Sequence, residues 1–250
     1  MSRGNNKVTS VLVTRPVHQS AGFVSLLESE NLRVVQLPSI EIEFTPVDLT
    51  ESLHSDLIIF TSVNSATGAY RSLQQFHNAQ WSSTAKIAAI GHVTAHSLKA
   101  FNISVDVVPD KGASTEALLE VIGDVSNRSV TIFRGDSGRE ALYNTLTTRG
   151  AIVRYQSVYK RSTPDYPKAR LDALLQQGLP DIISVTSDLG LTNLLSILPP
   201  DLIPSLLDKP LVVNSTRCAQ LAKSHGFVAE IKVADPAGDT AQLSQILSLR

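Results

Sequence analysis

The chain has 250 residues, 42% of them hydrophobic and 18% charged, and 22 Lys and Arg against 23 Asp and Glu give a formal net charge of -1. This composition excludes disordered and collagen-like chains, and the charge lacks the basic surplus of a general nucleic-acid binder. The single cysteine, Cys218, excludes an intrachain disulfide and a cysteine-rich zinc site. A polar amino terminus and the lack of a long apolar run predict a cytoplasmic protein without a signal peptide or membrane span.

Short apolar runs that end in small or polar residues predict strands at 8–14, 33–37, 56–61, 86–91, 105–108, 129–134, 152–155, 181–186, 210–213 and 229–233. Amphipathic patterns between these runs predict helices near 19–28, 64–75, 93–100, 115–122, 139–148, 189–198, 216–225 and 240–249. The alternation of continuous apolar strands with amphipathic helices predicts an α/β protein whose parallel sheets are covered on both faces.

The chain also contains an internal repeat. Asp56-Leu-Ile-Ile-Phe-Thr-Ser62 returns 125 positions later as Asp181-Ile-Ile-Ser-Val-Thr-Ser187. Further pairs recur in consistent order: 89–91 with 213–215, 108–110 with 233–235, and 11–15 with 130–134. The shared order and spacing indicate one five-stranded unit written twice. The alternative is that any two strand–helix units look alike.

The predicted strands end in small hydroxyl residues, glycine or arginine, each placed at the start of a helix. These residues are Thr14 and Arg15, Thr61 and Ser62, Gly91, Arg134 and Gly135, Thr186 and Ser187, and Ser215 and Thr216. Ligands bind at this edge of open parallel sheets, and helix N-termini there suit anions. The pattern therefore favours a ligand with several dispersed carboxylates or phosphates. Ser, Thr and Gly are also ordinary helix caps, so capping alone is the alternative at each position.

Standard catalytic motifs are absent from the sequence: there is no Walker A, GxGxxG, CxxC, HExxH or GxSxG pattern. Gly135-Asp-Ser-Gly138 has too few glycines, at the wrong spacing, for a dinucleotide loop. His92 and His96 have the spacing to share a metal on one helix face, but the sequence places no third ligand near them. We therefore expect no metal and no cofactor.

Several segments resemble the uroporphyrinogen-III synthase family, the cyclases of tetrapyrrole (porphyrin and heme) biosynthesis. They are Val13-Thr-Arg-Pro16, Phe60-Thr-Ser62, Ala89-Ile-Gly91 with Thr94-Ala95, Arg134-Gly-Asp-Ser-Gly-Arg-Glu140, Leu146-Thr-Thr-Arg-Gly-Ala151, Val158-Tyr-Lys-Arg161, Val185-Thr-Ser187 and Ile231-Lys-Val-Ala-Asp235. The segments follow the family order along nearly the whole chain. The Arg-Gly-x-x-Gly-Arg-Glu run and the later Tyr-Lys-Arg are the most specific of them.

The resemblance implies two flavodoxin-like or Rossmann-like parallel-sheet domains joined by a two-stranded connector. One domain would combine residues 1–37 with 164–250, and the other would be inserted between them at 45–154. The connector strands would be 38–44 and 155–163. Without the resemblance, the repeat alone suggests a division near residue 125.

The resemblance further implies a hydro-lyase that needs no cofactor or metal. It would cyclise linear hydroxymethylbilane to uroporphyrinogen III in a cleft between the domains, losing water and inverting ring D through a spiro intermediate. Tyr159 would donate a proton to the departing hydroxyl; the alternative is a connector tyrosine that only packs. The expected substrate-binding residues, several acting through backbone amides, are Arg15, Thr61, Ser62, Asn64, Gly91, Thr94, Arg134, Gly135, Arg139, Ser187, Ser215 and Thr216.

We expect a monomer whose upstream donor is hydroxymethylbilane synthase, with no nucleic-acid or membrane partner. Two other functions stay open at this point. One is a non-catalytic two-domain anion-binding module, which the absence of an export signal disfavours. The other is a phosphosugar or nucleotide-dependent transferase, which the absence of a phosphate loop disfavours.

Overall fold

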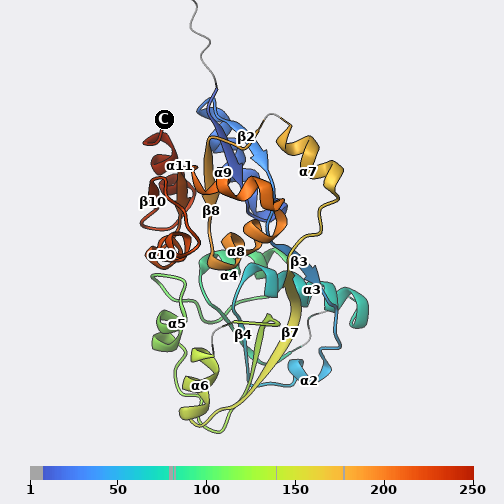
Figure 1. Cartoon of the computed structure of the whole chain (residues 1–250). Coiled ribbons are helices and arrows are strands. Elements are labelled where there is room, and N and C mark those ends of the chain that lie inside the picture. Colours follow the sequence, from blue (N-terminus) through green and yellow to red (C-terminus); the bar gives the residue numbers. More distant parts are fainter. Residues whose placement is uncertain (1–7, 79–80, 82, 139, 177) are drawn as a thin grey trace, which may run out of the picture. The chain divides into compact units, whose positions relative to one another are not determined.

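The computed structural model describes residues 8–78, 81, 83–138, 140–176 and 178–250 (Figure 1). Over these residues the chain forms two compact units. Residues up to Glu41 and Ser162–Arg250 make the first unit, and Ile42–Arg161 make the second. The predicted connector segments overlap β3 (Glu41–Phe44) and β7 (Ile152–Ser162), which are neighbours in the sheet of the second unit. The domain boundaries implied by the resemblance stay a prediction.

The first unit is a five-stranded parallel sheet in the order β10-β9-β8-β1-β2. Its strands are β1 (Ser10–Val13), β2 (Arg33–Gln36), β8 (Ile182–Val185), β9 (Leu211–Val213) and β10 (Ile231–Val233). Its helices are α1 (Val17–Ser29), α7 (Lys168–Leu175), α8 (Asp188–Ile197), α9 (Ile203–Leu207), α10 (Thr216–Ser224) and α11 (Asp239–Leu247), with a short 3-10 helix at Pro200–Leu202. In Figure 1 the blue β1 and β2 share this sheet with β8, from the other end of the sequence.

The second unit has a sheet in the order β3-β7-β6-β4-β5, and the pairs from β7 to β5 are parallel. Its remaining strands are β4 (Leu57–Phe60), β5 (Lys86–Ala89) and β6 (Ser129–Gly135). Its helices are α2 (Thr50–Leu53), α3 (Val63–Phe76), α4 (His92–Ala100), α5 (Thr115–Val121) and α6 (Ala141–Thr148). The predicted α/β class with two parallel-dominated sheets is confirmed.

Four equivalent strands lie in the same order in the two sheets, as the internal repeat predicts. β2-β1-β8-β9-β10 is the flavodoxin-like strand order, and in the second sheet β7, β6, β4 and β5 occupy the places of β2, β1, β8 and β9. The chain runs through these places from a different starting strand, since β6 and β7 come last in the second unit. Even a side-chain contact is repeated: the Asp56 carboxylate accepts bonds from the Ser129 N–H and hydroxyl at 2.8 and 2.7 Å. The Asp181 carboxylate accepts the equivalent bonds from Ser10 at 2.9 and 2.7 Å.

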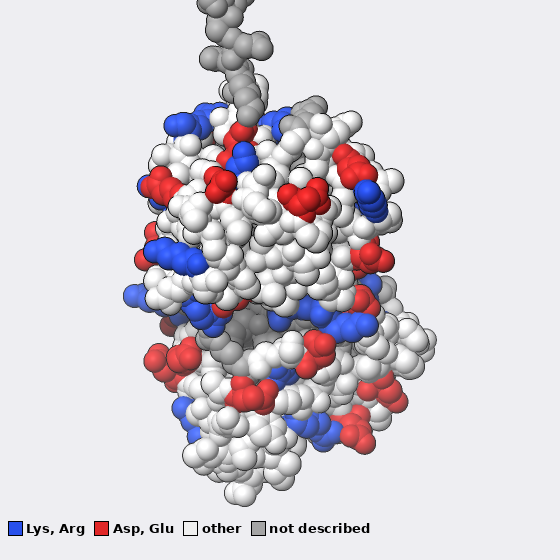
Figure 2. All heavy atoms as spheres, viewed as in Figure 1, with Lys and Arg blue, Asp and Glu red and all other residues white. Residues whose placement is uncertain are grey.

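Each sheet is covered on both faces because neighbouring strand residues point to opposite sides. In the first unit, Leu12 packs into the core beneath α8 and α10, whereas Val11 and Val13 pack into the core beneath α1 and α11. In the second unit, Ile58 packs with α3 and α4, and Ile59 packs with α5 and α6. Acidic and basic side chains are interspersed on the face seen in Figure 2, in line with the near-zero net charge.

The structure departs from the predicted elements in three ways. The strand predicted at 105–108 is reduced to a single bridge between Ala88 and Val107. The strand predicted at 152–155 continues as β7 to Ser162. Helices α2, α7 and α9 were not predicted, since α2 and α9 span little more than one turn and α7 buries only Leu171.

Candidate active site

The strongest candidate site lies where the strand order reverses in the second unit. β4 and β6 are neighbours there although β5 separates them in the chain, and ligands bind at such a reversal, outside the carboxyl ends of the strands. A pocket of about 130 Å³ opens at these ends. It brings together five predicted site residues, namely Thr61, Ser62, Arg134, Gly135 and Tyr159.

Tyr159 projects from β7 into this pocket and is 4% exposed. Its phenol oxygen lies 3.3 Å from the Ser62 hydroxyl and accepts a bond from the Arg161 guanidinium at 3.2 Å. β6 carries Gly135 opposite Tyr159, and a β-carbon there would lie 2.9 Å from the tyrosine ring. Glycine at 135 therefore makes the room in which the phenol meets its two partners.

Arg134 is the buried cation of the pocket, with its side chain 9% exposed. Its guanidinium bonds to Glu140 at 3.0 Å and lies 4.3 Å above the centre of the Tyr155 ring. The Tyr155 hydroxyl donates to the other Glu140 oxygen at 2.7 Å. Bonds from Tyr155 and Arg134 lower the pKa of Glu140. Burial and the bond to Glu140 raise the pKa of Tyr155 to about 12, so Tyr155 stays a neutral donor.

The start of α3 forms the pocket wall beside Tyr159. Ser62 caps the helix: its hydroxyl accepts the Ser65 N–H and its own N–H donates to the Ser65 hydroxyl, both at 3.1 Å. This reciprocal capping box occupies the Ser62 amide that we expected to bind a carboxylate. The N–H of Val63, at the first helical position, has no acceptor within the helix. At this helix end the N–H group that can bind an anion is therefore that of Val63, one residue after the Ser62 amide that we expected.

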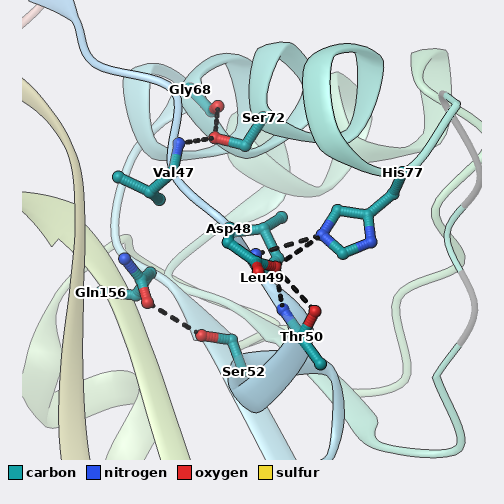
Figure 3. Close-up of polar contacts among 9 residues, drawn as sticks. All are labelled: Val47, Asp48, Leu49, Thr50, Ser52, Gly68, Ser72, His77 and Gln156. Carbon is teal, nitrogen blue, oxygen red and sulfur yellow. Dashed lines mark hydrogen bonds and ion pairs between the residues drawn. The ribbon is translucent and has the colours of Figure 1, made fainter.

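Close packing fixes α3 against β7. Gly68 lies so near β7 that a β-carbon there would be 2.6 Å from the Val158 carbonyl oxygen. Figure 3 shows α2 and the segment before it tied to these two elements. The Val47 N–H, before α2, donates to the Ser72 hydroxyl on α3 at 3.1 Å, and the Ser52 hydroxyl, on α2, donates to Gln156 on β7 at 3.0 Å. These contacts hold the Ser62 and Tyr159 elements at a fixed separation.

In the first unit, the predicted residues cap helices at the equivalent sheet edge. The Ser187 hydroxyl accepts the Gly190 N–H at 3.1 Å at the start of α8, and the Ser215 hydroxyl accepts the Cys218 N–H at 3.2 Å at the start of α10. Thr216 is exposed at the first position of α10. Both helix starts thus present first-turn amides at the carboxyl ends of β8 and β9.

Arg15 lies two residues after the end of β1, Arg134 is the next-to-last residue of β6, and the two side chains are held in the same way. Its guanidinium forms an ion pair with Asp239 and lies 4.3 Å above the centre of the Phe23 ring, with the side chain 11% exposed. Arg15 and Arg134 are therefore each engaged with an acid and an aromatic ring of their own unit. A ligand carboxylate must compete with Asp239 for Arg15, or with Glu140 for Arg134.

Comparisons with known proteins agree with this architecture. A family model described as uroporphyrinogen-III synthase HemD matches residues 21–237. The chain belongs to the uroporphyrinogen-III synthase family. It is 31% identical over 245 residues to the uroporphyrinogen-III synthase of Escherichia coli (strain K12), covering 94% of this chain and 98% of the relative. It is 32% identical to that of Salmonella typhimurium over 248 residues, with the same coverage.

A solved structure of this family has the same fold. The uroporphyrinogen-III synthetase of Helicobacter pylori 26695 aligns over 97% of this chain and 100% of its own, with a TM-score of 0.66 at 17% sequence identity. The resemblance noted in the sequence is confirmed, and with it the class of enzyme, a cyclase of the lyase type. No comparison supports the non-catalytic binding module.

Other residues expected to bind substrate in this uroporphyrinogen-III synthase family member lie outside the pocket lining. Asn64 is buried in the first turn of α3, and Thr94 is buried in α4. Gly91 is covered by Ala113, because a β-carbon on Gly91 would lie 2.6 Å from the Ala113 methyl group. Arg139 lies outside the described residues.

The prediction missed the other five residues that line the pocket: Ile132, Ser137, Gly138, Tyr155 and Arg161. Arg161 follows Tyr159 by two positions on one strand, so the period-two rule places both on one face and was a usable signal. Gly138 has φ +150° and leaves room for Arg134, whose Nη2 atom would lie 2.7 Å from a β-carbon at 138. That contact depends on the loop conformation, which the sequence pattern does not reveal.

Across the described ranges, no group of three or more His, Cys, Asp or Glu side chains is arranged to hold a metal ion. Burial raises the pKa of Cys218 to about 12, so this thiol stays protonated at neutral pH. No helix among the described residues is long and apolar enough to cross a membrane.

Proposed function

We propose that this chain cyclises hydroxymethylbilane to uroporphyrinogen III, with loss of water and inversion of ring D, and that the Tyr159 pocket is where the departing hydroxyl receives its proton. Family membership supports the reaction. The observation that carries the assignment of the pocket is the pairing of a buried phenol with the Arg161 guanidinium, 3.2 Å from the phenol oxygen, at the reversal of strand order.

The chemistry at Tyr159 follows from its two partners. Because Arg161 donates to the phenol oxygen, the Tyr159 proton is directed away from the guanidinium, toward Ser62 or a ligand. Transfer of that proton to the leaving hydroxyl of the substrate produces water and a phenolate. The Arg161 guanidinium then faces the negative charge on the phenolate, which a charge-assisted hydrogen bond stabilises.

The substrate has eight carboxylates, and the strand ends of the two units supply groups suited to them. In the second unit these are the first-turn amides of α3 and the Arg134 guanidinium. In the first unit they are the amides that follow Ser187 and Ser215. Electron-rich pyrroles expel hydroxide readily, so the main task is to hold the chain curled. Such positioning can contribute about 7–11 kcal/mol in well-oriented systems.

We also propose that the protein acts as a cytoplasmic monomer, with hydroxymethylbilane synthase as the upstream donor of its substrate. The single cysteine supports the compartment, because it leaves no disulfide for an oxidising environment to form within the chain. Gel filtration across a range of protein concentrations tests the monomer, and a second peak of twice the mass contradicts it.

The test of the reaction is incubation with hydroxymethylbilane followed by separation of the type I and type III isomers. Spontaneous closure gives isomer I, so accelerated formation of isomer III identifies the activity. We expect this activity to survive chelation and desalting. A product mixture equal to that of the buffer blank contradicts the proposed function, whereas activity that needs added metal contradicts only its cofactor independence.

A further inference from the structure

A series of hydrogen-bonded polar side chains in the first unit leads from the core to the edge of the sheet. Ser184 on β8 and Gln242 on α11 both have no exposed surface. The Ser184 hydroxyl donates to Gln242 Oε1 at 2.8 Å, and Gln242 Nε2 donates to Asn214 Oδ1 at 2.7 Å. Asn214 is half-buried directly after β9, and Ser215, which follows it, caps α10. This series of hydrogen-bonded side chains thus ends at Asn214, among the groups that we assign to carboxylate binding.

The internal repeat shows that the fold does not need these polar residues. The repeat pairs Ser184 with Ile59 and Asn214 with Ile90, and the same alignment pairs Gln242 with Ala117. Ile59 is fully buried, and Ile90 packs in the same apolar core. Replacing a buried hydrogen-bonded set by apolar groups of similar shape is often close to neutral for stability. The polar set of the first unit therefore calls for a reason other than folding.

The hydrogen bond from Gln242 decides which way the Asn214 amide points. Gln242 Nε2 uses the Asn214 oxygen as its acceptor, so the NH₂ group of Asn214 is the end turned away from Gln242. An amide NH₂ group is a donor of two hydrogen bonds. It stands at the carboxyl end of β9, where the first turn of α10 already favours anions.

We propose that Asn214 binds a carboxylate of the substrate through its NH₂ group, and that Gln242, anchored by Ser184, is the positioning residue that fixes this orientation. The inference rests on the proposed function for the identity of the ligand, a linear tetrapyrrole with acetate and propionate groups. It adds to the expected site a side-chain donor that neither capping nor the backbone provides.

Two substitutions at Asn214 separate the loss of the donor from the gain of a charge. Asn214→Ala removes the donor, and loss of a hydrogen bond to a carboxylate predicts a rise in KM of about tenfold to a hundredfold with kcat little changed. Asn214→Asp keeps an acceptor for Gln242 but turns a carboxylate toward the ligand, so KM should rise further. Gln220→Glu, which adds the same charge at an exposed position of α10, is the control and should leave KM unchanged.

The role of Gln242 is tested by removing its donor. Gln242→Met keeps an unbranched side chain of similar length but cannot donate to the Asn214 oxygen, so the amide loses its fixed orientation and KM should rise toward the Asn214→Ala level. The triple variant Ser184→Ile, Gln242→Ala, Asn214→Ile copies the second unit. It should unfold at a urea midpoint near that of the wild type while its KM rises to the Asn214→Ala level.

Calorimetry with uroporphyrin III, the oxidised octacarboxylate, gives a Kd for each variant without catalysis. The same order of weakening in Kd supports the inference. Unchanged KM and Kd in Asn214→Ala and Asn214→Asp overturn it, and leave the proposed function standing if the wild type still forms isomer III. A wild type that forms no isomer III contradicts the proposed function, and the Kd comparison still decides the role of Asn214.

Discussion

At the scale of single residues, the second unit shows how glycine makes a polar site possible. Gly135 and Gly138 lie against Tyr159 and Arg134, and a β-carbon at either position would come within 3 Å of those side chains. The pocket therefore depends on the absence of a side chain at these two glycines as well as on its hydrogen-bond donors. Substitutions that add a single methyl group can test this dependence without changing any charge.

Gly135→Ala should displace the Tyr159 ring, because the new methyl group would lie 2.9 Å from it. The phenol then loses its positions beside Ser62 and Arg161, and we expect the rate of isomer III formation to fall toward that of a Tyr159→Phe enzyme. The matched control is Gly22→Ala on α1, where a β-carbon meets nothing within 4 Å. The measurement is the initial rate of isomer III formation by both variants, and equal rates in the two contradict the assigned position of Tyr159.

At the scale of helices and strands, close contacts between backbones help to fix positions, and the sequence pattern does not reveal these contacts. Short continuous apolar runs predicted most strands, because a strand buried on both faces is apolar at nearly every position, and amphipathic patterns predicted most helices, because one helix face packs on the sheet. These patterns failed for α2 and α9, which are too short to show a period, and for the segment around Val107, which makes only one bridge. The contact of Gly68 with Val158 leaves no periodic trace at all.

Gly68→Ala tests that contact between α3 and β7. The added methyl group would lie 2.6 Å from the Val158 carbonyl oxygen, a backbone atom that cannot turn aside, so the helix must shift. Overpacking of this kind costs about 1–3 kcal/mol, whereas Gly22→Ala at an open helical position should stabilise by about 1 kcal/mol. Urea unfolding measures both free energies, and a Gly68→Ala protein as stable as Gly22→Ala contradicts the close approach.

The bond between Asp56 and Ser129 joins the starts of β4 and β6 and makes stability depend on pH. Hydrogen bonds from Ser129 lower the pKa of Asp56 in the folded protein. A carboxyl whose folded pKa is depressed stabilises above its unfolded pKa, about 3.9, and loses that contribution as the pH falls through the folded value. Asp56→Asn, which does not titrate, should therefore be less stable than the wild type at pH 7.

The difference between Asp56→Asn and the wild type should shrink as the pH is lowered below about 4, since the wild-type carboxyl is then increasingly protonated. Urea midpoints of both proteins at pH 7 and pH 3 provide the measurement. Taking the difference between the two midpoints at each pH cancels the contributions of the other titrating groups, which both proteins share. A gap that stays constant between the two pH values contradicts this contribution.

At the scale of the whole molecule, the sequence predicted the fold class, the repeat and the family, because these depend on order and periodicity. It also predicted part of the pocket: five named residues meet there. Spacing alone did not reveal that Ser62 uses its own amide in a capping box, that Gly91 lies under Ala113, or that Asp239 and Glu140 hold the two strand-end arginines. Those outcomes depend on contacts between segments far apart in the chain or on local loop conformation.

The most direct test of the central claim, that Tyr159 protonates the leaving hydroxyl, is the isomer-resolved initial rate of Tyr159→Phe. The variant keeps the ring and removes the donor, and positioned acids typically contribute about 10²–10⁴-fold. Because the hydroxyl departs readily, we expect turnover to fall by at most about a hundredfold, with isomer III still the enzymatic product. Tyr70→Phe, whose ring stacks on Phe101 in the same unit, should keep full activity. Full activity in Tyr159→Phe, or accelerated formation of isomer I, contradicts the account.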